Sequence, residues 1–220
     1  MLLKRVIIPV LLIASVAPAL AGPWMRTEGE TFLSYSIETD FENGISDGSG
    51  FYGSFYAEHG LTHGLTLGLD AGGHEDDMSK AIAFLRWPIG ATDRSTRIVP
   101  EFGLGMARET FALRPGLSVG RGFELGDKPG WLSIHSRAVI IGSFDGILET
   151  DITFGLSPRP DAKIILQLQT GIPTQSDPYA KLAPSYIRRI APGRHVELGL
   201  VAGVAEADDF KLKFGLWQQF

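Results

Sequence analysis

The sequence contains no cysteine, which excludes a disulfide framework, a zinc site with cysteine ligands and a thiol nucleophile. It also has no excess of basic residues: 20 Lys and Arg stand against 25 Asp and Glu, for a formal net charge of −5 at pH 7. This balance argues against a nucleic-acid partner. After residue 24, no segment approaches the roughly 18 consecutive apolar residues of a membrane-spanning helix. Long stretches with helical periodicity are missing as well.

The first residues have the three parts of a secretory signal peptide. Lys4 and Arg5 form a charged region, an apolar run follows, and Ala-Leu-Ala at 19–21 is a typical cleavage site. The alternative is a membrane anchor helix, which two prolines in the apolar run disfavour. We therefore expect residues 1–21 to be a signal peptide and residues 22–220 to be the exported protein.

Apolar and polar residues alternate along much of the chain. In one such segment Ile152 and Phe154 share a face with Leu148, while Glu149 and Asp151 occupy the other face. A period of two indicates a β-strand with one apolar and one polar face.

Twelve strands are predicted from these segments and from the turns rich in Gly, Pro, Asp and Ser between them. They cover residues 30–40, 51–58, 64–73, 80–89, 97–107, 111–121, 131–143, 147–156, 163–173, 179–190, 195–205 and 209–220. An even number returns the chain to its starting side, as bacterial outer-membrane barrels require. We predict an all-β fold, a transmembrane antiparallel up-and-down β-barrel of about 12 strands with short connections and no room for a plug domain. Ten or fourteen strands stay open, because such boundaries drift by about 2–4 residues.

A soluble β-sandwich or a lipocalin-like barrel would also alternate, with its apolar face turned inward. Three features favour the membrane barrel: charges lie in mid-strand on the polar face, the other face is nearly free of charge, and the chain ends on Phe220 after an alternating strand. Aromatic residues near the predicted strand ends are expected to form interfacial girdles. They are Trp24, Tyr35, Trp87, Trp131, Tyr179, Tyr186 and Trp217.

The last residues, "FKLKFGLWQQF", resemble the C-terminal insertion signal of bacterial outer-membrane β-barrels, a final aromatic residue preceded by alternating apolar ones. The residues that carry this resemblance are Phe210, Leu212, Phe214, Leu216 and Phe220. Gln218 departs from the pattern. The resemblance implies a location in the cell outer membrane, contact with outer-membrane lipid, and recognition by the barrel-assembly machinery during insertion.

A second resemblance concerns "YAEHGLTHGLTLGLDAG", residues 56–72. This segment is similar to a strand–turn–strand unit of the outer-membrane proteins grouped with meta-pathway phenol degradation.

Neither a metal nor a cofactor is expected. His59 and His63 flank a turn, where their side chains do not converge reliably on one ion. The segment "HEDD" at 74–77 offers Asp76 and Asp77 to a calcium ion but lacks a full loop spacing.

An enzyme is not expected either, although "SIHSR" places His135 beside Ser133 and Ser136. Outer-membrane lipases use Ser and His. Ser133 and His135 share the polar, inward phase with Arg137, whereas a lipid substrate lies outside the wall. A G-x-S-x-G elbow is absent. A hydrogen-bonded lumen histidine is the favoured interpretation, and a lipid-acting enzyme is the least favoured function.

The inward phase is the informative surface. Barrels of about eight strands are filled by side chains and those of 16–18 strands enclose wide channels, so twelve strands predict a narrow channel for passive transport of small solutes. The residues predicted to line the pore are Arg86, Glu101, Arg114, His135, Arg137, Glu149, Asp151, Lys181, Arg189, Glu197, Lys211 and Lys213. The alternative is a structural or surface-interaction barrel with a closed lumen. The solute is unknown, and a monomer is expected.

Three inward arginines, Arg86, Arg114 and Arg137, lie on the fourth, sixth and seventh predicted strands, and Glu101 lies on the fifth. Facing residues on adjacent antiparallel strands are roughly 4.5–5.5 Å apart, which suits ion pairs between long side chains. The acidic residues predicted to pair with these arginines are Glu101, Glu149 and Asp151.

Overall fold

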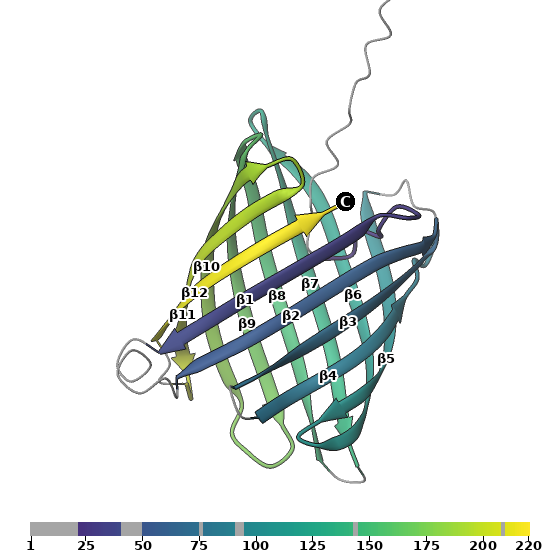
Figure 1. The fold of residues 1–220 in the computed structure, drawn as a ribbon, viewed down its shortest axis with the longest axis vertical. Helices are drawn as coiled ribbons and strands as arrows, with labels where there is room; N and C mark the ends of the chain where they lie inside the picture. The colour runs from purple at the N-terminus through teal and green to yellow at the C-terminus, as the bar shows by residue number, and fades with distance from the viewer. Residues whose placement is uncertain (1–21, 41–49, 75–76, 91–94, 143–144, 208–209) are drawn as a thin grey trace, which may run out of the picture.

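The protein is a closed barrel of twelve antiparallel strands (Figure 1). The computed structural model describes residues 22–40, 50–74, 77–90, 95–142, 145–207 and 210–220. The strands are β1 (Thr31–Asp40), β2 (Phe51–Thr62), β3 (Leu65–His74), β4 (Asp77–Arg86), β5 (Thr96–Ala107), β6 (Thr110–Leu125), β7 (Lys128–Ile141), β8 (Asp145–Arg159), β9 (Ala162–Pro173), β10 (Tyr179–Ala191), β11 (Arg194–Ala205) and β12 (Phe210–Gln219). Each strand pairs with its neighbours in the chain, and β1 pairs with β12 to close the barrel.

The predicted fold class and strand number are confirmed, and each predicted segment overlaps one strand. The largest displacement is in β4, which runs from 77 to 86 rather than from 80 to 89. The connection before β4 spans only residues 75–76, and the longer connection 87–95 follows it. The polar residues at the start of β4, which the sequence analysis assigned to a turn, therefore belong to the strand.

The apolar face points outward. On β5, Phe102, Leu104 and Met106 are 45–52% exposed, whereas Glu101 is 3% and Val99 0% exposed. Soluble monomers rarely leave contiguous apolar patches larger than a few hundred Å² open to water. Exposed Leu, Ile and Phe side chains recur on the strands around the barrel, so its outer surface matches lipid rather than water.

None of the described residues belongs to a helix that could cross a membrane.

The start of β1 and the C-terminal residue meet at one end of the barrel, which we call the termini end. Thr31 N donates a hydrogen bond to the Phe220 carbonyl (2.7 Å), and Phe220 N donates one to the Thr31 carbonyl (3.0 Å). The connections at this end span residues 63–64, 87–95, 126–127, 160–161 and 192–193, and those at the opposite end span 41–50, 75–76, 108–109, 142–144, 174–178 and 206–209. Bacterial outer-membrane barrels carry their short turns on the periplasmic side.

The segment that precedes β1, residues 22–30, we call the strap; its first part, residues 22–26, is buried or half-buried at the termini end. Pro23 is fully buried, and the Gly22 carbonyl accepts a 2.8 Å hydrogen bond from Arg86. A Cβ atom at Gly120 would come within 2.5 Å of Pro23 Cγ, so glycine at this position leaves room for the strap. The absence of a plug domain was predicted, but this inward segment was not.

Aromatic and aliphatic side chains fill part of the lumen beside the strap. The buried members of this cluster are Phe32, Trp131, Ile165, Ile187 and Trp217, with Trp24 and Tyr56 packed against them. The predicted girdle is therefore wrong for Trp24, Trp131 and Trp217, which face inward.

Parity explains the position of Trp131, because its strand neighbours of the same parity also face the lumen. A Cβ atom at Gly155 would lie 2.1 Å from the Trp131 ring, so the indole occupies the space above a glycine on β8. Tyr35, Trp87 and Tyr186 are 40–44% exposed, as girdle residues would be. The remaining predicted girdle residue, Tyr179, lines the lumen cavity.

Candidate functional site

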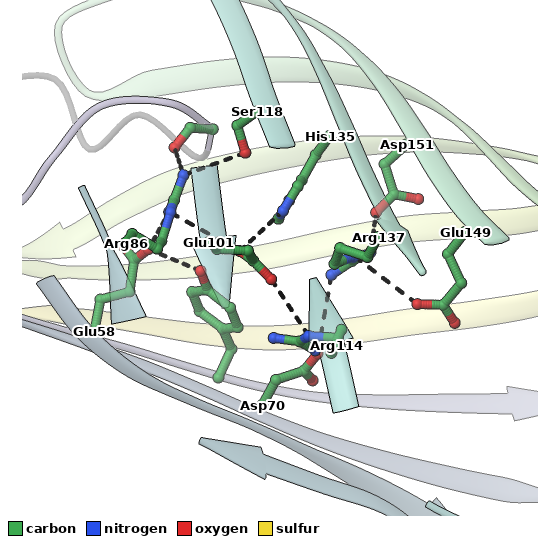
Figure 2. A network of polar contacts seen from close by, with 12 residues as sticks. Glu58, Asp70, Arg86, Glu101, Arg114, Ser118, His135, Arg137, Glu149 and Asp151 are labelled. Atoms are coloured by element: carbon green, nitrogen blue, oxygen red, sulfur yellow. Dashed lines mark hydrogen bonds and ion pairs between the residues drawn. The ribbon is translucent and has the colours of Figure 1, made fainter. Parts of the chain in front are cut away.

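A chain of ion pairs runs across the inner face of β4, β5 and β6 (Figure 2). Glu101 on β5 is its centre. The Glu101 carboxylate lies 3.3 Å from Arg114 Nε and 4.0 Å from Arg86 Nε, and its side chain is 0% exposed. Arg86 and Glu101 are directly paired in the ladder between β4 and β5, as the predicted strand order implied. The predicted ion pairs between Glu101 and both arginines are present.

Asp70 on β3 also belongs to this chain of ion pairs. It accepts a hydrogen bond from Arg114 and one of 3.0 Å from Lys80 Nζ. Arg137 Nη1 lies 3.9 Å from the same carboxylate. Asp70 therefore links two predicted arginines that are not on its own neighbouring strands.

Arg137 on β7 joins the network to β8. Its Nη2 donates a 2.6 Å hydrogen bond to Asp151, and its Nε lies 3.8 Å from Glu149. Arg137 and Glu149 are ladder partners. The predicted pairing of Arg137 with both acidic residues is present, and Figure 2 shows the two carboxylates on one side of the guanidinium.

Glu58 on β2 ties the strap to the network. It accepts a hydrogen bond of 2.7 Å from Arg26 Nε and a further one from Arg86. The Arg26 backbone N–H donates to the Thr66 hydroxyl at 3.3 Å. Both Glu58 and Arg26 are buried, so a charged pair holds the strap against β2, β3 and β4.

His135 on β7 is a member of the same network. Its Nε2 lies 3.0 Å from Glu101 Oε2, within hydrogen-bond distance, as the lumen-histidine interpretation expected. Ser133 is buried nearby, and its Oγ would lie 3.0 Å from a Cβ atom at Gly22. The strap therefore covers the serine from the lumen side. His135 points to a carboxylate on β5.

A cavity of about 450 Å³ occupies the middle of the lumen. Along β1 its lining runs from Phe32 to Glu38, which is most of the length of that strand. On the side of β8 to β12 the lining is hydrophilic and less charged. These residues are Glu149, Asp151, Thr153, Gln167, Gln169, Thr170, Tyr179, Lys181 and Lys213, together with Trp217.

The other predicted pore residues also lie on inward positions. Glu197 is buried, accepting 3.0 Å from Trp217 Nε1 and lying 3.1 Å from Lys213 Nζ. Arg189 faces His195 across the ladder between β10 and β11 at the termini end. Lys211 pairs in register with Asp40 on β1.

The residues of the predicted insertion signal lie on β12 or at its end. Phe210, Phe214 and Phe220 are 49–72% exposed. Leu212 and Leu216, of the same parity, are half-buried. This parity is the outward one.

The structure separates His59 and His63, the two histidines that were considered as metal ligands. His59 Nδ1 is 2.8 Å from the Thr31 hydroxyl, while His63 Nδ1 is 2.8 Å from Glu28, so the two rings have different partners. Asp76 lies outside the described residues. Within the described ranges no three His, Asp or Glu side chains are grouped so as to hold a metal ion.

A second cavity, of about 660 Å³, lies at the opposite end. Its apolar lining includes Ile82, Val139, Ile141 and Ile147, and charged residues such as Lys80 complete it. These inward apolar residues of β4, β7 and β8 pack together. The lumen is thus polar at its middle and apolar patches flank it at both ends.

The fold is shared with outer-membrane porins of known structure. The KdgM porin superposes with a TM-score of 0.64 at 12% identity, over 86% of this chain and 99% of that one. The NanC porin gives 0.59 at 10% identity, over 86% and 98%. An outer-membrane channel from Pseudomonas putida F1 gives 0.55 at 12% identity, over 89% and 97%. No family model and no curated protein matches the sequence.

Glu58 and Asp70 belong to the ion-pair network but were not among its predicted members. Glu58 pairs with Arg86 two strands away, and Asp70 with Arg114 three strands away. Adjacent-strand register cannot predict such contacts. They arise because the closed wall is strongly curved, and its inward side chains meet across the concave face.

Proposed function

We propose that this chain is a narrow channel of the outer membrane, through which small solutes pass passively. The observation that supports this most is the lumen cavity of about 450 Å³, lined by polar and charged side chains along most of β1. A core built only for stability would be expected to be apolar and closely packed, since burying polar groups is costly. A polar, hydrated interior suits solutes.

The passage is expected to be narrow for two reasons. The strap occupies the termini end beside β4 and β6, and the ion-paired arginines reach inward from β4, β6 and β7. Both reduce the cross-section on the side of β3 to β7. At the middle of the lumen the path for solutes is therefore along β8 to β12 and β1, where most of the lining is hydrophilic. At the termini end the apolar cluster around Trp131 and Trp217 narrows this side as well.

The fold likeness supports the same assignment. The solved structures that share this fold include porins. One structure of the KdgM porin was obtained in complex with oligogalacturonate. At identities near 12%, this likeness concerns the fold, and the solute of the present chain has to be established separately.

Planar-bilayer recording tests the proposal. Purified protein refolded in detergent should give discrete conductance steps, and the same sample heated until it loses its compact gel mobility should give none. If the folded parent and a variant that lacks residues 22–28 are both silent, the closed structural barrel is the correct alternative. The buried ion pairs and the apolar clusters at both ends of the lumen favour that alternative.

We further propose that residues 1–21 are removed on export and that the barrel inserts as a monomer into the outer membrane. The outward position of Phe210, Leu212, Phe214 and Leu216 supports recognition of β12 by the barrel-assembly machinery and contact with lipid. In cells, a Phe220 deletion should lower the folded, heat-modifiable fraction more than a Gln218→Leu change does. Equal amounts in both variants would contradict the role of Phe220.

The similarity of residues 56–72 to the meta-pathway phenol-degradation proteins also stays a proposal. It is supported by the fact that this segment forms the β2–β3 hairpin, a strand–turn–strand unit. An operon of aromatic-compound catabolism around the gene would support it.

A catalytic role is not part of this proposal. His135 bonds to Glu101 and the strap covers Ser133, and both residues face the lumen rather than lipid. Release of fatty acid from labelled phospholipid, abolished by Ser133→Ala, would contradict this.

A further inference from the structure

Two cationic residues and a histidine occupy inward positions on neighbouring strands at the termini end. Arg189 on β10 and His195 on β11 are ladder partners. Lys163 on β9 is the partner of Ile187, the inward position next to Arg189. Lys163 and Arg189 both interact electrostatically with His195. We call these three residues the mouth triad.

The mouth triad has no neutralising carboxylate in the part of the chain that the structure describes. The nearby acidic residues are engaged elsewhere: Glu197 with Lys213 at 3.1 Å, and Asp161 with Arg159 and Arg188 at 3.0 Å. Arg188 is the neighbour of opposite parity, so Asp161 neutralises a cation on the outer side of the wall. In a chain with a formal net charge of −5, two neighbouring cations, Lys163 and Arg189, without a carboxylate partner among the described residues are unusual.

The indole of Trp131 lies next to Lys163 of the mouth triad and adds a hydrogen-bond donor. Lys163 Nζ lies 5.9 Å from the centre of the Trp131 ring. The Nε1 atom of the same indole is buried and has no hydrogen-bond partner among the described residues. Like charges held close together repel each other, and a bound anion relieves this repulsion.

We propose that Lys163, Arg189 and His195 form a binding site for the anionic group of a small solute, a carboxylate or a phosphate, at the termini end of the lumen. The inward direction of the three side chains argues against a lipid headgroup, because lipid lies outside the wall. Lys163 and His195 are half-buried and Arg189 is exposed, so the group has to enter the mouth of the barrel to reach all three residues.

This inference names the solute class of the proposed channel and rests on that function for its biological meaning. Binding itself does not require conduction. Loss of binding with intact conductance would overturn only the site, and binding without conductance would overturn only the channel.

Calorimetric titration of the folded protein in detergent tests the site. Inorganic phosphate and acetate are added in separate experiments at constant ionic strength, and we expect saturable binding of at least one of them. Lys163→Gln and Arg189→Gln should each weaken the affinity about tenfold, the factor for the loss of one charge-assisted contact. The matched control is Arg194→Gln, which removes an exposed cation of opposite parity beside His195.

The proposal is overturned if neither anion saturates the parent, or if Arg194→Gln weakens binding as much as Arg189→Gln does. The second result would mean that only the general charge of the rim attracts anions. Heat-modifiable migration of each variant on a gel shows that it is folded. The indole of Trp131 gives a second readout: its fluorescence should change on binding in the parent but not in Trp131→Phe.

Discussion

The two sides of the lumen wall use charge in different ways. On β2 to β6 the charged side chains are almost fully buried and bonded to one another; we call this the paired wall, with Glu58, Asp70, Arg86, Glu101 and Arg114 as its members. On β8 to β12 several inward side chains are half-buried and line the cavity; we call this the open wall, with Asp151, Gln167, Gln169, Lys181 and Lys213 as its members. Charge holds the first wall together. In the second wall the ion-paired Asp151 and Lys213 also face the cavity.

Burial decides the difference. Glu101 and Arg114 have side chains that are 0% and 1% exposed, whereas Asp151 is 20% exposed. Removing one partner of a buried ion pair leaves an uncompensated charge and costs about 3–5 kcal/mol, while a pair open to solvent is worth about 0–1 kcal/mol. The paired wall should therefore resist substitution, and the open wall should tolerate it. Three substitutions test this contrast.

Arg114→Ala should have the largest effect, because both Glu101 and Asp70 lose a buried counter-charge. We expect a loss of about 3–5 kcal/mol in the free energy of unfolding, seen as a lower temperature for the heat-induced gel shift. In the molecules that remain folded, conductance should rise and ion preference should shift toward cations. Arg121→Ala removes an exposed arginine from the same strand and is the control. Equal stability of the two variants would show that the paired wall does not depend on its charges.

Gly120→Val should have an intermediate effect on stability and a distinct effect on conductance. The new side chain would overlap Pro23, and overpacking of this kind costs about 1–3 kcal/mol. Because displacement of the strap relieves the overlap, conductance should increase and a protease should cut the strap faster. Gly122 on the same strand has only a carbonyl oxygen 3.8 Å from the corresponding Cβ position, so Gly122→Val is the control. Unchanged conductance in Gly120→Val would indicate that the strap does not narrow the passage.

Asp151→Asn in the open wall should have the smallest effect on stability. Arg137 keeps Glu149 and Asp70 as counter-charges, so we expect a loss of about 1 kcal/mol or less. Reversal potentials in a salt gradient should nevertheless shift toward anions, because a negative charge has left the cavity lining. If stability falls as far as in Arg114→Ala while selectivity stays constant, the two walls do not differ in kind.

The sequence predicted most of the fold because period-two alternation is a local property of the chain. Strand number and the pairing of Glu101 with Arg86 follow from alternation and from the order of neighbouring strands. The outward direction of the apolar face was predicted from charges in mid-strand, the nearly uncharged other face and the terminal Phe220. The contacts that could not be predicted depend on the curvature of the barrel wall and on how side chains fill the lumen. Asp70 reaches Arg114 across the concave wall, and Trp131 turns inward over Gly155. These contacts have no signature within a single strand.

The strap was missed for a different reason. Residues 22–30 show no alternation, so they were assigned only to the start of the exported chain. The position of the strap is indicated by the residues that it contacts. Glu58 points inward and its charge is paired by Arg26, and the glycine at position 120 leaves space that Pro23 occupies. Such unfilled space and unpaired charge can be recognised only when the three-dimensional structure of the barrel wall is known.

The seam between β1 and β12 has a consequence for the order of events during folding. Glu30 and Gln219, which are bonded across it, are 189 positions apart in the chain, whereas every other ladder joins strands that follow one another directly. Contacts between distant parts of a chain form slowly, since loop closure has to precede them. Eleven hairpins can assemble as a growing ribbon, but its first strand keeps an unpaired edge until the twelfth arrives. An unpaired edge is a template for aggregation, so the newly made chain needs protection for as long as this seam is open.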